Sequence, residues 1–276
     1  MIKSTAGLVE RFKGPLRTPY YYLLFRAKAL KLGFEEWRKR NDGDDPLPIP
    51  PPLLRYRVHG ALDAQSYLQV GRVCAQDIKD LLGSIGRDIY SFNHVLDFGC
   101  GSGRVMRFFH DRPASCRLYG TDIDSQAIAW CRKHLHFAQW DTNDAAPPTS
   151  YADATFDFIY SISVFTHLDE RMQFDWLNEL KRVSKPGAIL ILSVHGTAAF
   201  PDWSEDEKAL VAEKGFLFKV VRPELFDPTG LPPFYQATKH TREYVEAQWS
   251  RLFKIVGYVE AGIGTYQDAV ILQNQY

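Results

Sequence analysis

Hydrophobic residues recur along this chain in two alternating patterns from about residue 65 onward. Between Gln65 and Leu82 the apolar positions have the spacing of an amphipathic helix. Further helical segments alternate with short apolar runs that have the length of buried strands, at 94–98, 117–121, 136–140, 155–165 and 185–196. This alternation predicts an α/β fold, a mostly parallel sheet with helices on both faces.

Capping residues and apolar faces place the helices between these strands. The first is expected to begin near Arg104, directly after a glycine-rich turn. Asp124 and Ser125 are suited to cap the second, and Thr166-x-x-Asp169 resembles a capping box for the next. The tail reads as a helix followed by two strands, at 241–252, 253–259 and 267–274.

The first 60 residues differ from the rest in charge. They carry 12 Lys and Arg against 6 Asp and Glu, net +6, while the whole chain is neutral. Residues 20–40 fit an amphipathic helix interrupted near Gly33, and 42–52 fit an extended, proline-rich spacer. This helix either meets a membrane surface or partner through its basic, apolar surface, or packs on the body of the protein.

Composition places the chain among ordinary globular proteins. Its 276 residues, 45% hydrophobic and 24% charged, suffice for one large α/β domain. No run reaches the roughly 18 to 20 apolar residues of a membrane-spanning helix, and the N-terminus has no signal-peptide core, so the cytoplasm is the expected location. The four cysteines are dispersed and His134-x-His136 has no matching partners, so we expect no metal.

The chain is organised around residues 94–104, HVLDFGCGSGR. A strand that stops at a glycine-rich turn and restarts as a helix predicts free backbone N–H groups with no Cβ to hold a ligand away. The dinucleotide fingerprint G-x-G-x-x-G would need glycine at position 104, which is Arg104. The glycine-rich turn therefore suits a nucleoside ligand, bound differently from the pyrophosphate of a dinucleotide. A tight turn without a ligand is the alternative.

The pattern Asp97-x-Gly99-x-Gly101-x-Gly103 resembles the first motif of the class I S-adenosylmethionine (SAM)-dependent methyltransferases, D/E-x-G-x-G-x-G. Asp122 follows 19 residues after Gly103, at the tip of the second strand, where an acid can accept both ribose hydroxyls. The resemblance implies a Rossmann-like, seven-stranded sheet ending in an antiparallel hairpin. Asp122 could otherwise serve only as a helix cap.

The same resemblance implies roles for individual residues. The three glycines would let the backbone approach the methionine and ribose parts, Asp97 would support the loop or meet the ammonium, and Asp122 would take the ribose hydroxyls. Ile123 would press on adenine, and Asp141 would meet its amino group unless the register slips by one or two residues. The remaining expected cofactor residues are Phe98 at the end of the first strand and Ser161, with Ser163, beside the methyl.

Three histidines fall where a general base is useful. His167 follows the fourth strand, His195 ends the fifth, and His240 precedes the last long helix. Histidine titrates near neutrality and can accept a hydroxyl proton. His167 and His195 are the candidate catalytic residues. As alternatives, His167 caps its helix and His195 hydrogen-bonds a loop, and some acceptors need no base.

The segment SISVFTHLDE is similar to bacterial methyltransferases of unassigned substrate, some of which tailor glycans. We therefore expect O-methylation of a sugar, glycan or other small polar molecule, with S-adenosylhomocysteine (SAH) as product. Residues 61–276 would form the catalytic domain after an N-terminal arm at 1–60. An aromatic, proline-rich insertion at 197–239 is either a cap on the acceptor pocket or a surface excursion.

Three other functions remain open at this stage. The chain could bind SAM without catalysis, as a structural or regulatory protein. Aminopropyl transfer uses a related fold, but its grouped acids are replaced here by Val164-Phe165-Thr166. The sequence argues against methylation of nucleic acid, because no N/D-P-P-Y tetrad occurs and the basic residues lie in the arm. The sequence leaves the oligomeric state undetermined.

Overall fold

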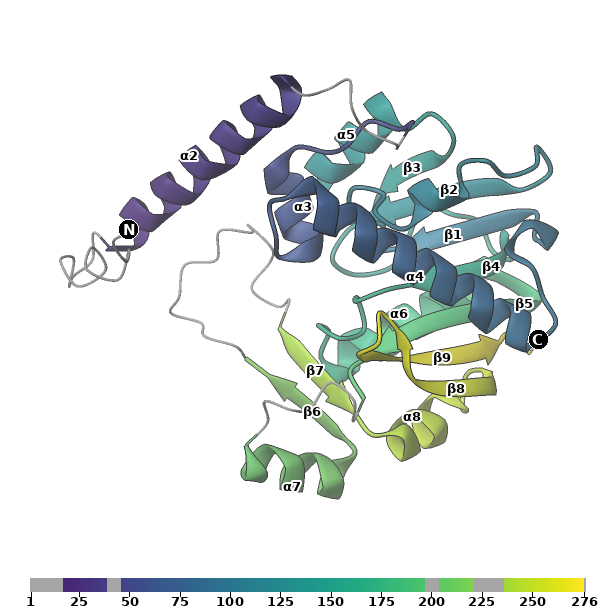
Figure 1. Cartoon of the computed structure of the whole chain (residues 1–276). Helices are drawn as coiled ribbons and strands as arrows, with labels where there is room; N and C mark the ends of the chain where they lie inside the picture. The colour runs from purple at the N-terminus through teal and green to yellow at the C-terminus, as the bar shows by residue number, and fades with distance from the viewer. Residues whose placement is uncertain (1–16, 39–45, 197–203, 221–235, 276) are drawn as a thin grey trace.

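The computed structural model describes residues 17–38, 46–196, 204–220 and 236–275. A seven-stranded sheet forms its centre, in the order β3-β2-β1-β4-β5-β9-β8 (Figure 1). The first five strands in sequence pair in parallel, and β9 runs antiparallel to both β5 and β8. The strands are β1 His94–Phe98, β2 Arg117–Asp122, β3 Gln139–Thr142, β4 Phe156–Ser161, β5 Ser184–Val194, β8 Lys254–Ile263 and β9 Gln267–Gln273. The predicted Rossmann-like sheet with its C-terminal hairpin is confirmed.

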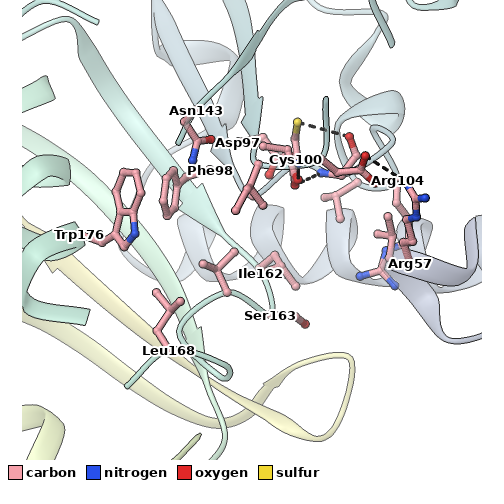
Figure 2. Close-up of a pocket in the computed structure, with 18 of the residues that line it drawn as sticks. Arg57, Asp97, Phe98, Cys100, Arg104, Asn143, Ile162, Ser163, Leu168 and Trp176 are labelled. Carbon is pink, nitrogen blue, oxygen red and sulfur yellow. Dashed lines mark hydrogen bonds and ion pairs between the residues drawn. The ribbon is translucent and has the colours of Figure 1, made fainter. Parts of the chain in front are cut away.

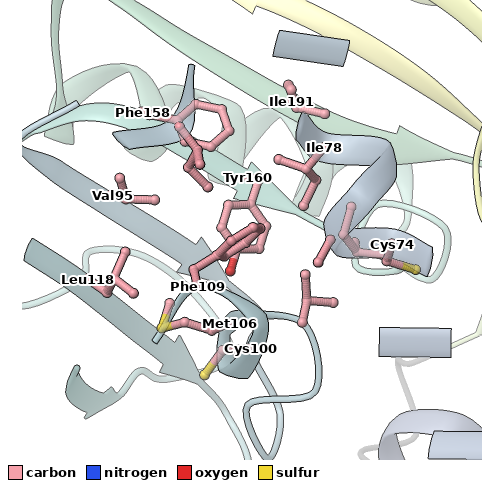
Figure 3. Packing of buried hydrophobic residues seen from close by; sticks show 14 of the residues in the cluster. Cys74, Ile78, Val95, Cys100, Met106, Phe109, Leu118, Phe158, Tyr160 and Ile191 are labelled. Atoms are coloured by element: carbon pink, nitrogen blue, oxygen red, sulfur yellow. The ribbon is translucent and has the colours of Figure 1, made fainter. Parts of the chain in front are cut away.

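Helices cover both faces of this sheet, as the alternation of strands and helices predicted. Val95 and Leu96 are adjacent in β1 and belong to different hydrophobic clusters, one on each face. Figure 3 shows the cluster around Val95, where Ile78 and Phe109 meet the sheet. The covering helices are α4 Ala64–Ser84 and α5 Ser125–His134 on the Val95 face, and α6 Glu170–Val183 and α8 Arg242–Trp249 on the other.

The helix expected after the glycine turn is much shorter than predicted. Only a 3₁₀ helix, η2 Met106–Phe109, forms there, preceded by turns from Gly101 to Val105. Both ends limit it, because Gly101 and Gly103 have positive φ angles and Pro113 follows closely. The prediction of an α-helix N-terminus at Arg104 was therefore wrong.

Two other boundaries moved, each for a local reason. The cap of α6 is Asp169, which accepts a hydrogen bond from Met172 N at 2.8 Å, so Thr166 is not the first residue of a capping box. Thr166 instead accepts at its carbonyl oxygen from Thr238 N. The third strand begins at Gln139, three residues later than predicted, because the chain still turns after α5.

The N-terminal segment contributes two described helices, α2 Arg17–Arg38 and α3 Pro52–His59 (Figure 1). α3 lies over the glycine loop, and α2 extends outward from it. No helix among the described residues is long and apolar enough to cross a membrane. Within the insertion, α7 Glu205–Lys214 precedes a two-stranded antiparallel sheet formed by β6 Phe216–Lys219 and β7 Ala237–His240. Residues 1–16, 39–45, 197–203 and 221–235 lie outside the described residues.

Candidate active site

A pocket of about 960 Å³, its open side included, lies beyond the carboxyl ends of β1, β2 and β4. Ligands of open α/β sheets bind at this edge. Figure 2 shows Arg57 and Arg104 at one end and Phe98, Trp176 and Leu168 toward the other. The lining residues belong to the segments 57–58, 97–105, 122–124, 143–145 and 162–168, together with Trp176. One end of the pocket is therefore charged and the other apolar.

The glycine loop shapes the pocket by leaving out side chains. Gly99, Gly101 and Gly103 have φ angles of +80°, +52° and +75°, which side-chain-bearing residues rarely adopt. Most loop N–H groups are satisfied within the protein: Gly99 and Cys100 donate to Thr121 O, and Gly103 donates to Cys100 O. The expected nest of free N–H groups is thus largely absent, and close approach of the backbone is the loop's main contribution.

α3 packs directly on this loop. A Cβ built on Gly101 would lie 2.6 Å from Val58 Cγ2, so the helix and loop approach closely only because residue 101 is glycine. Arg57 donates from Nη1 to both carboxylate oxygens of Asp124, at 3.1 and 2.9 Å. Both Arg57 and Val58 line the pocket. The segment N-terminal to the main domain therefore supplies one wall of the site.

Asp97 is a buried acid of the pocket whose pKa is far from its ordinary value. It is 3% exposed and accepts a hydrogen bond from Tyr160 OH at 3.0 Å, and these two residues are direct partners in the β1–β4 pairing. Burial raises the pKa of Asp97 to about 8, against the opposing effect of the Tyr160 hydrogen bond. Without a ligand, the Asp97 carboxyl group is therefore mostly protonated near pH 7. A positively charged ligand group beside it would favour the ionised carboxylate.

Asp122 ends β2 and holds the glycine loop. Its Oδ2 accepts from Gly101 N and its Oδ1 from Asp124 N, both at 2.7 Å. Burial raises the pKa of Asp122, and these backbone N–H groups oppose that effect. A carboxylate has about four acceptor positions, so each oxygen keeps capacity for another donor. Asp122 and its neighbour Ile123 both line the pocket, as predicted from their place after the second strand.

Arg104 brings a buried positive charge to the same pocket. It is 7% exposed, and its Nη1 lies 3.4 Å from His59 Nδ1. Within the described chain it forms no ion pair with a carboxylate, and its Nε has no hydrogen-bond partner. Burial, followed by the charge of Arg104, lowers the pKa of His59. An anionic group of a ligand would satisfy this guanidinium, because buried charges are normally paired.

The residues that follow β3 line the pocket two positions later than expected. Asp141 is not part of the lining, because it forms an ion pair with Arg132 and accepts a hydrogen bond from Ser150. Asn143, Asp144 and Ala145 line the pocket instead. Asn143 accepts from Thr121 Oγ1 at 2.9 Å, which fixes its orientation. The pocket lining thus begins two residues after Asp141.

Of the two serines at the end of β4, Ser161 in the strand and Ser163 after it, only Ser163 lines the pocket. Ser163 does so with a φ of +61°, and its Oγ accepts from Gln267 Nε2 at 2.7 Å. Ser161 is fully buried outside the lining, and its Oγ has no hydrogen-bond partner in the described chain. Gly103 also lies outside the lining. At the apolar end, the rings of Phe98 and Trp176 are 4.7 Å apart.

His167 and His195 lie together beside the pocket. Their ring centroids are 6.2 Å apart, although neither residue belongs to the pocket lining. His167 directly precedes Leu168, which does line it. The Nδ1 of His167 lies 2.6 Å from Gln236 O, and the Nδ1 of His195 lies 3.3 Å from Thr238 O.

The partner carbonyls decide the tautomer of both rings. A carbonyl can only accept, so each Nδ1 carries the proton and each Nε2 holds a lone pair. Burial lowers the pKa of His167 to about 4 and also lowers the pKa of His195. Both rings are therefore neutral near pH 7, with Nε2 as the basic atom. The proposed alternative for His167, capping α6, is not observed, because Asp169 is the cap.

His240 has a different environment. It is fully buried, and its Nε2 lies 2.9 Å from Gln173 Oε1. Burial lowers its pKa to about 3. Its backbone N–H donates to His195 O, which ties β7 to the end of β5. The side chain of His240 is therefore part of the protein core and does not line the pocket.

Several lining residues escaped the sequence analysis. Arg104 appeared only as a break in a fingerprint, and nothing in the local pattern marked Trp176, because it reaches the pocket from a distant segment. Tyr160 was missed for the same reason. An aspartate at the end of one apolar strand and a tyrosine in the next parallel strand would have been the signal to look for.

The comparisons with known proteins agree with this geometry. Residues 96–192 match the family model described as a methyltransferase domain. This range includes the end of β1, the glycine loop, Asp122, the lining residue Ser163 and most of β5. It therefore covers the elements that build the cofactor side of the pocket.

Two curated relatives share parts of the sequence. The malonyl-[acyl-carrier protein] O-methyltransferase of Enterobacter lignolyticus is 29% identical over 122 residues, which are 43% of this chain and 45% of that protein. The 2-methyl-6-phytyl-1,4-hydroquinone methyltransferase of Synechocystis is 28% identical over 145 residues, 51% of this chain and 41% of that protein. The chain thus matches less than half the length of either relative.

Solved structures extend the similarity of the fold beyond the matched domain. A Pyrococcus horikoshii protein is 16% identical with a TM-score of 0.52, covering 80% of this chain and 98% of that one. The Burkholderia thailandensis 1,6-didemethyltoxoflavin-N1-methyltransferase, solved with SAH bound, is 14% identical with a TM-score of 0.51 and covers 83% and 92%. At these identities the similarity concerns the fold.

Proposed function

We propose that this chain, which belongs to the class I SAM-dependent methyltransferases, transfers a methyl group from SAM to an oxygen of a small polar acceptor. A sugar or glycan hydroxyl is the first acceptor to test. The observation that carries the proposal is the pocket itself. It combines two acids at the ends of neighbouring strands, a glycine-rich loop and a buried arginine.

The residues present suit SAM. The ligand has an ammonium, a carboxylate and a ribose diol, and the pocket offers the unpaired acid Asp97, the arginine Arg104 and the acceptor Asp122. A Cβ on Gly99 or Gly101 would lie 2.1 Å from Val164 or 2.6 Å from Val58, so the cradle exists only with glycine at these positions. The pocket is open on one side, so an acceptor can approach a bound nucleoside from that side.

Each pocket residue then has a defined task. Asp97 binds the ammonium and Arg104 the carboxylate of the amino-acid part, which together recognise a zwitterion. Asp122 accepts the ribose hydroxyls, Ile123 contacts the adenine, and Asn143 offers an amide near the same end. When bound, SAM supplies an electrophilic methyl group on a sulfonium with a neutral thioether as leaving group. The protein's remaining work is orientation and, for a hydroxyl acceptor, removal of a proton.

The histidine pair is the candidate for that proton transfer. A hydroxyl acceptor needs a nearby neutral base, and the Nε2 atoms of His167 and His195 have the required lone pair. Two carbonyls of one segment hold the rings: Gln236 O, directly before β7, and Thr238 O, within β7. We therefore assign the insertion a positioning role, in which it fixes the tautomer of both bases. This arrangement favours O-methylation over a reaction that needs no base.

The cofactor proposal is tested by calorimetric titration with SAH. The native protein is expected to bind, and Asp122→Ala to bind about 10-fold or more weakly, a loss of about 1.4 kcal/mol or greater. Asp141→Ala is the matched control, since this acid lies outside the pocket and should change the affinity less than about 2-fold. Absence of binding by the native protein would require withdrawal of the methyltransferase proposal.

Turnover separates the enzyme from a protein that only binds SAM. Purified protein incubated with methyl-labelled SAM and sugars, nucleotide sugars and polysaccharides is expected to yield SAH and a labelled methyl ether. Binding of SAH without transfer to any acceptor pool would favour the non-catalytic alternative. Label on a carboxylate, nitrogen or carbon would retain the activity and correct the acceptor atom.

The histidines predict a distinctive pH profile. His195→Gln and His167→Gln are each expected to lower kcat by about 100-fold, the usual contribution of a general base, while SAH affinity stays within about 2-fold. Because the pKa of His167 is lowered to about 4, its basic form persists as pH falls through 6, and activity should decline only toward pH 4. His136→Gln, an exposed histidine, is the control. Unchanged kcat in both variants would remove the pair from the mechanism.

A further inference from the structure

The outer face of α2 carries a stripe of apolar side chains. Leu23, Ala27, Leu30 and Phe34 follow one another at intervals of four, three and four residues, which places them on one side of a helix. The three large side chains are 65%, 72% and 59% exposed, respectively. Single exposed leucines are common on protein surfaces, but an aligned series marks an interaction site. We call these four residues the outer stripe.

The opposite face of α2 is the one that packs on the protein. Ala29 is 2% exposed, and the rings of Phe25 and Tyr56 lie 4.7 Å apart. Glu36 accepts two hydrogen bonds from Arg55 Nη2, each at 2.8 Å. These contacts attach α2 to α3 and turn the outer stripe away from it. Among the described residues, these contacts account for the inner face of α2.

Positive charges border the outer stripe. Helical geometry places Arg26 along one side and Lys31 and Arg38 along the other. Of the two acids in the helix, Glu36 pairs with Arg55 of α3 and Glu35 pairs with Lys31 at 3.9 Å. Arg26 and Arg38 therefore remain as excess positive charge along this border. Apolar residues between rows of Lys and Arg favour an anionic lipid surface.

We propose that α2 docks this protein on anionic lipid, with the outer stripe in the interface and the bordering cations at the headgroups. The helix lies along the surface, since no described helix is suited to span a bilayer. Burial of Leu23 and Leu30 supplies the apolar attraction, and Arg26, Lys31 and Arg38 supply selectivity for negative charge. The inference is independent of the methyl-transfer proposal, because the pocket includes no residue of α2.

A second copy of the chain fits this surface less well. In a two-fold contact between outer stripes, each copy would present the same patch, so the bordering cations of one helix would face those of the other. Such juxtaposition of like charges disfavours association. Glu35 is the single exposed acid of the helix and already lies near Lys31. Charge therefore favours lipid over self-association.

Vesicle cosedimentation tests the proposal with the full chain. The protein is expected to bind vesicles that contain phosphatidylglycerol, to bind pure phosphatidylcholine at least about 10-fold more weakly, and to lose affinity as salt rises. Leu23→Ser with Leu30→Ser should weaken binding by about 10-fold or more, as should Arg26→Glu with Lys31→Glu. Val73→Ser with Val256→Ser, exposed apolar residues elsewhere, is the matched control and should retain full binding.

Two further measurements distinguish the alternatives. SAH titration of the leucine variant should give the native affinity, which shows that the fold and pocket are intact. Failure of the native chain to bind anionic vesicles would overturn the proposal and leave the cofactor proposal standing. Concentration-dependent self-association that the leucine variant abolishes, without vesicle binding, would overturn it in favour of a second copy.

Discussion

Asp97→Asn is expected to weaken SAH binding by about 100-fold, or about 2.7 kcal/mol, while making the unliganded fold more stable above neutral pH. The amide has the shape of the acid but cannot balance the ammonium charge of the ligand. Calorimetry gives the affinity, and chemical denaturation gives the free energy of unfolding. An unchanged affinity would remove Asp97 from the ammonium site.

The stability half of this result follows from linkage. The pKa of Asp97 is about 8 in the folded protein and near 3.8 in the unfolded chain. Because the pKa is higher in the folded protein, the contribution of Asp97 to the free energy of unfolding is fully present below pH 4. That contribution is lost as the pH rises through 8. The asparagine variant lacks this loss, so its advantage should grow between pH 4 and 8 and reach about 2 kcal/mol or more.

The same linkage makes ligand binding depend on pH. An ammonium beside Asp97 favours its ionised form, so binding near pH 7 should release a proton. Affinity should rise with pH up to about 8 and level off above. Titrations in buffers of different ionisation enthalpy measure this release. Tyr160→Phe removes the hydrogen bond that lowers the pKa of Asp97, and should move the pH dependence upward.

Gly99→Ala is expected to destabilise the fold by about 2–5 kcal/mol. The new Cβ would lie 2.1 Å from Val164 Cγ2, and the φ angle of +80° strains any residue with a side chain. Denaturant unfolding measures the effect. Val164→Ala in the same chain should restore the part that is due to the clash and leave about 1–2 kcal/mol of backbone strain.

The helix α4 offers a matched control for this substitution. At Gly83 a Cβ would meet nothing within 4 Å, and the backbone is helical there. Gly83→Ala should therefore stabilise the protein by about 0.5–1 kcal/mol, because alanine loses less conformational freedom on folding. The same chemical change thus has opposite signs at the two positions. Equal effects would contradict the account of the glycine loop.

The fold could be predicted from the sequence because the signals for its strands and helices each lie within a short stretch of the chain. Apolar runs of strand length, amphipathic helices and the acid at the tip of β2 each lie within a few residues. Asp122 and Ile123 were found in this way and do line the pocket. The strand limits were less accurate, since the chain after α5 turns before β3 pairs.

Features that depend on pairing between distant residues could not be read from the sequence. Tyr160 meets Asp97 through strand register across 63 residues, and this contact decides the charge of the acid. Arg104 became informative only when its burial without a carboxylate partner was visible. The hydrogen bonds from His167 to Gln236 O and from His195 to Thr238 O likewise span the insertion, so the sequence could suggest a base but not its protonated nitrogen.

Arg55 ties the N-terminal segment to the rest of the protein, which limits where the chain can be truncated or joined to a relative. It is 1% exposed and binds Glu36, Pro50 O and Leu62 O, so it joins α2, the proline-rich stretch and the start of the main domain. A chain begun at residue 61 would lose these bonds together with Val58 above the glycine loop. The segment is thus not an interchangeable module. Chimeras that borrow it from a relative must exchange the facing loop residues as well.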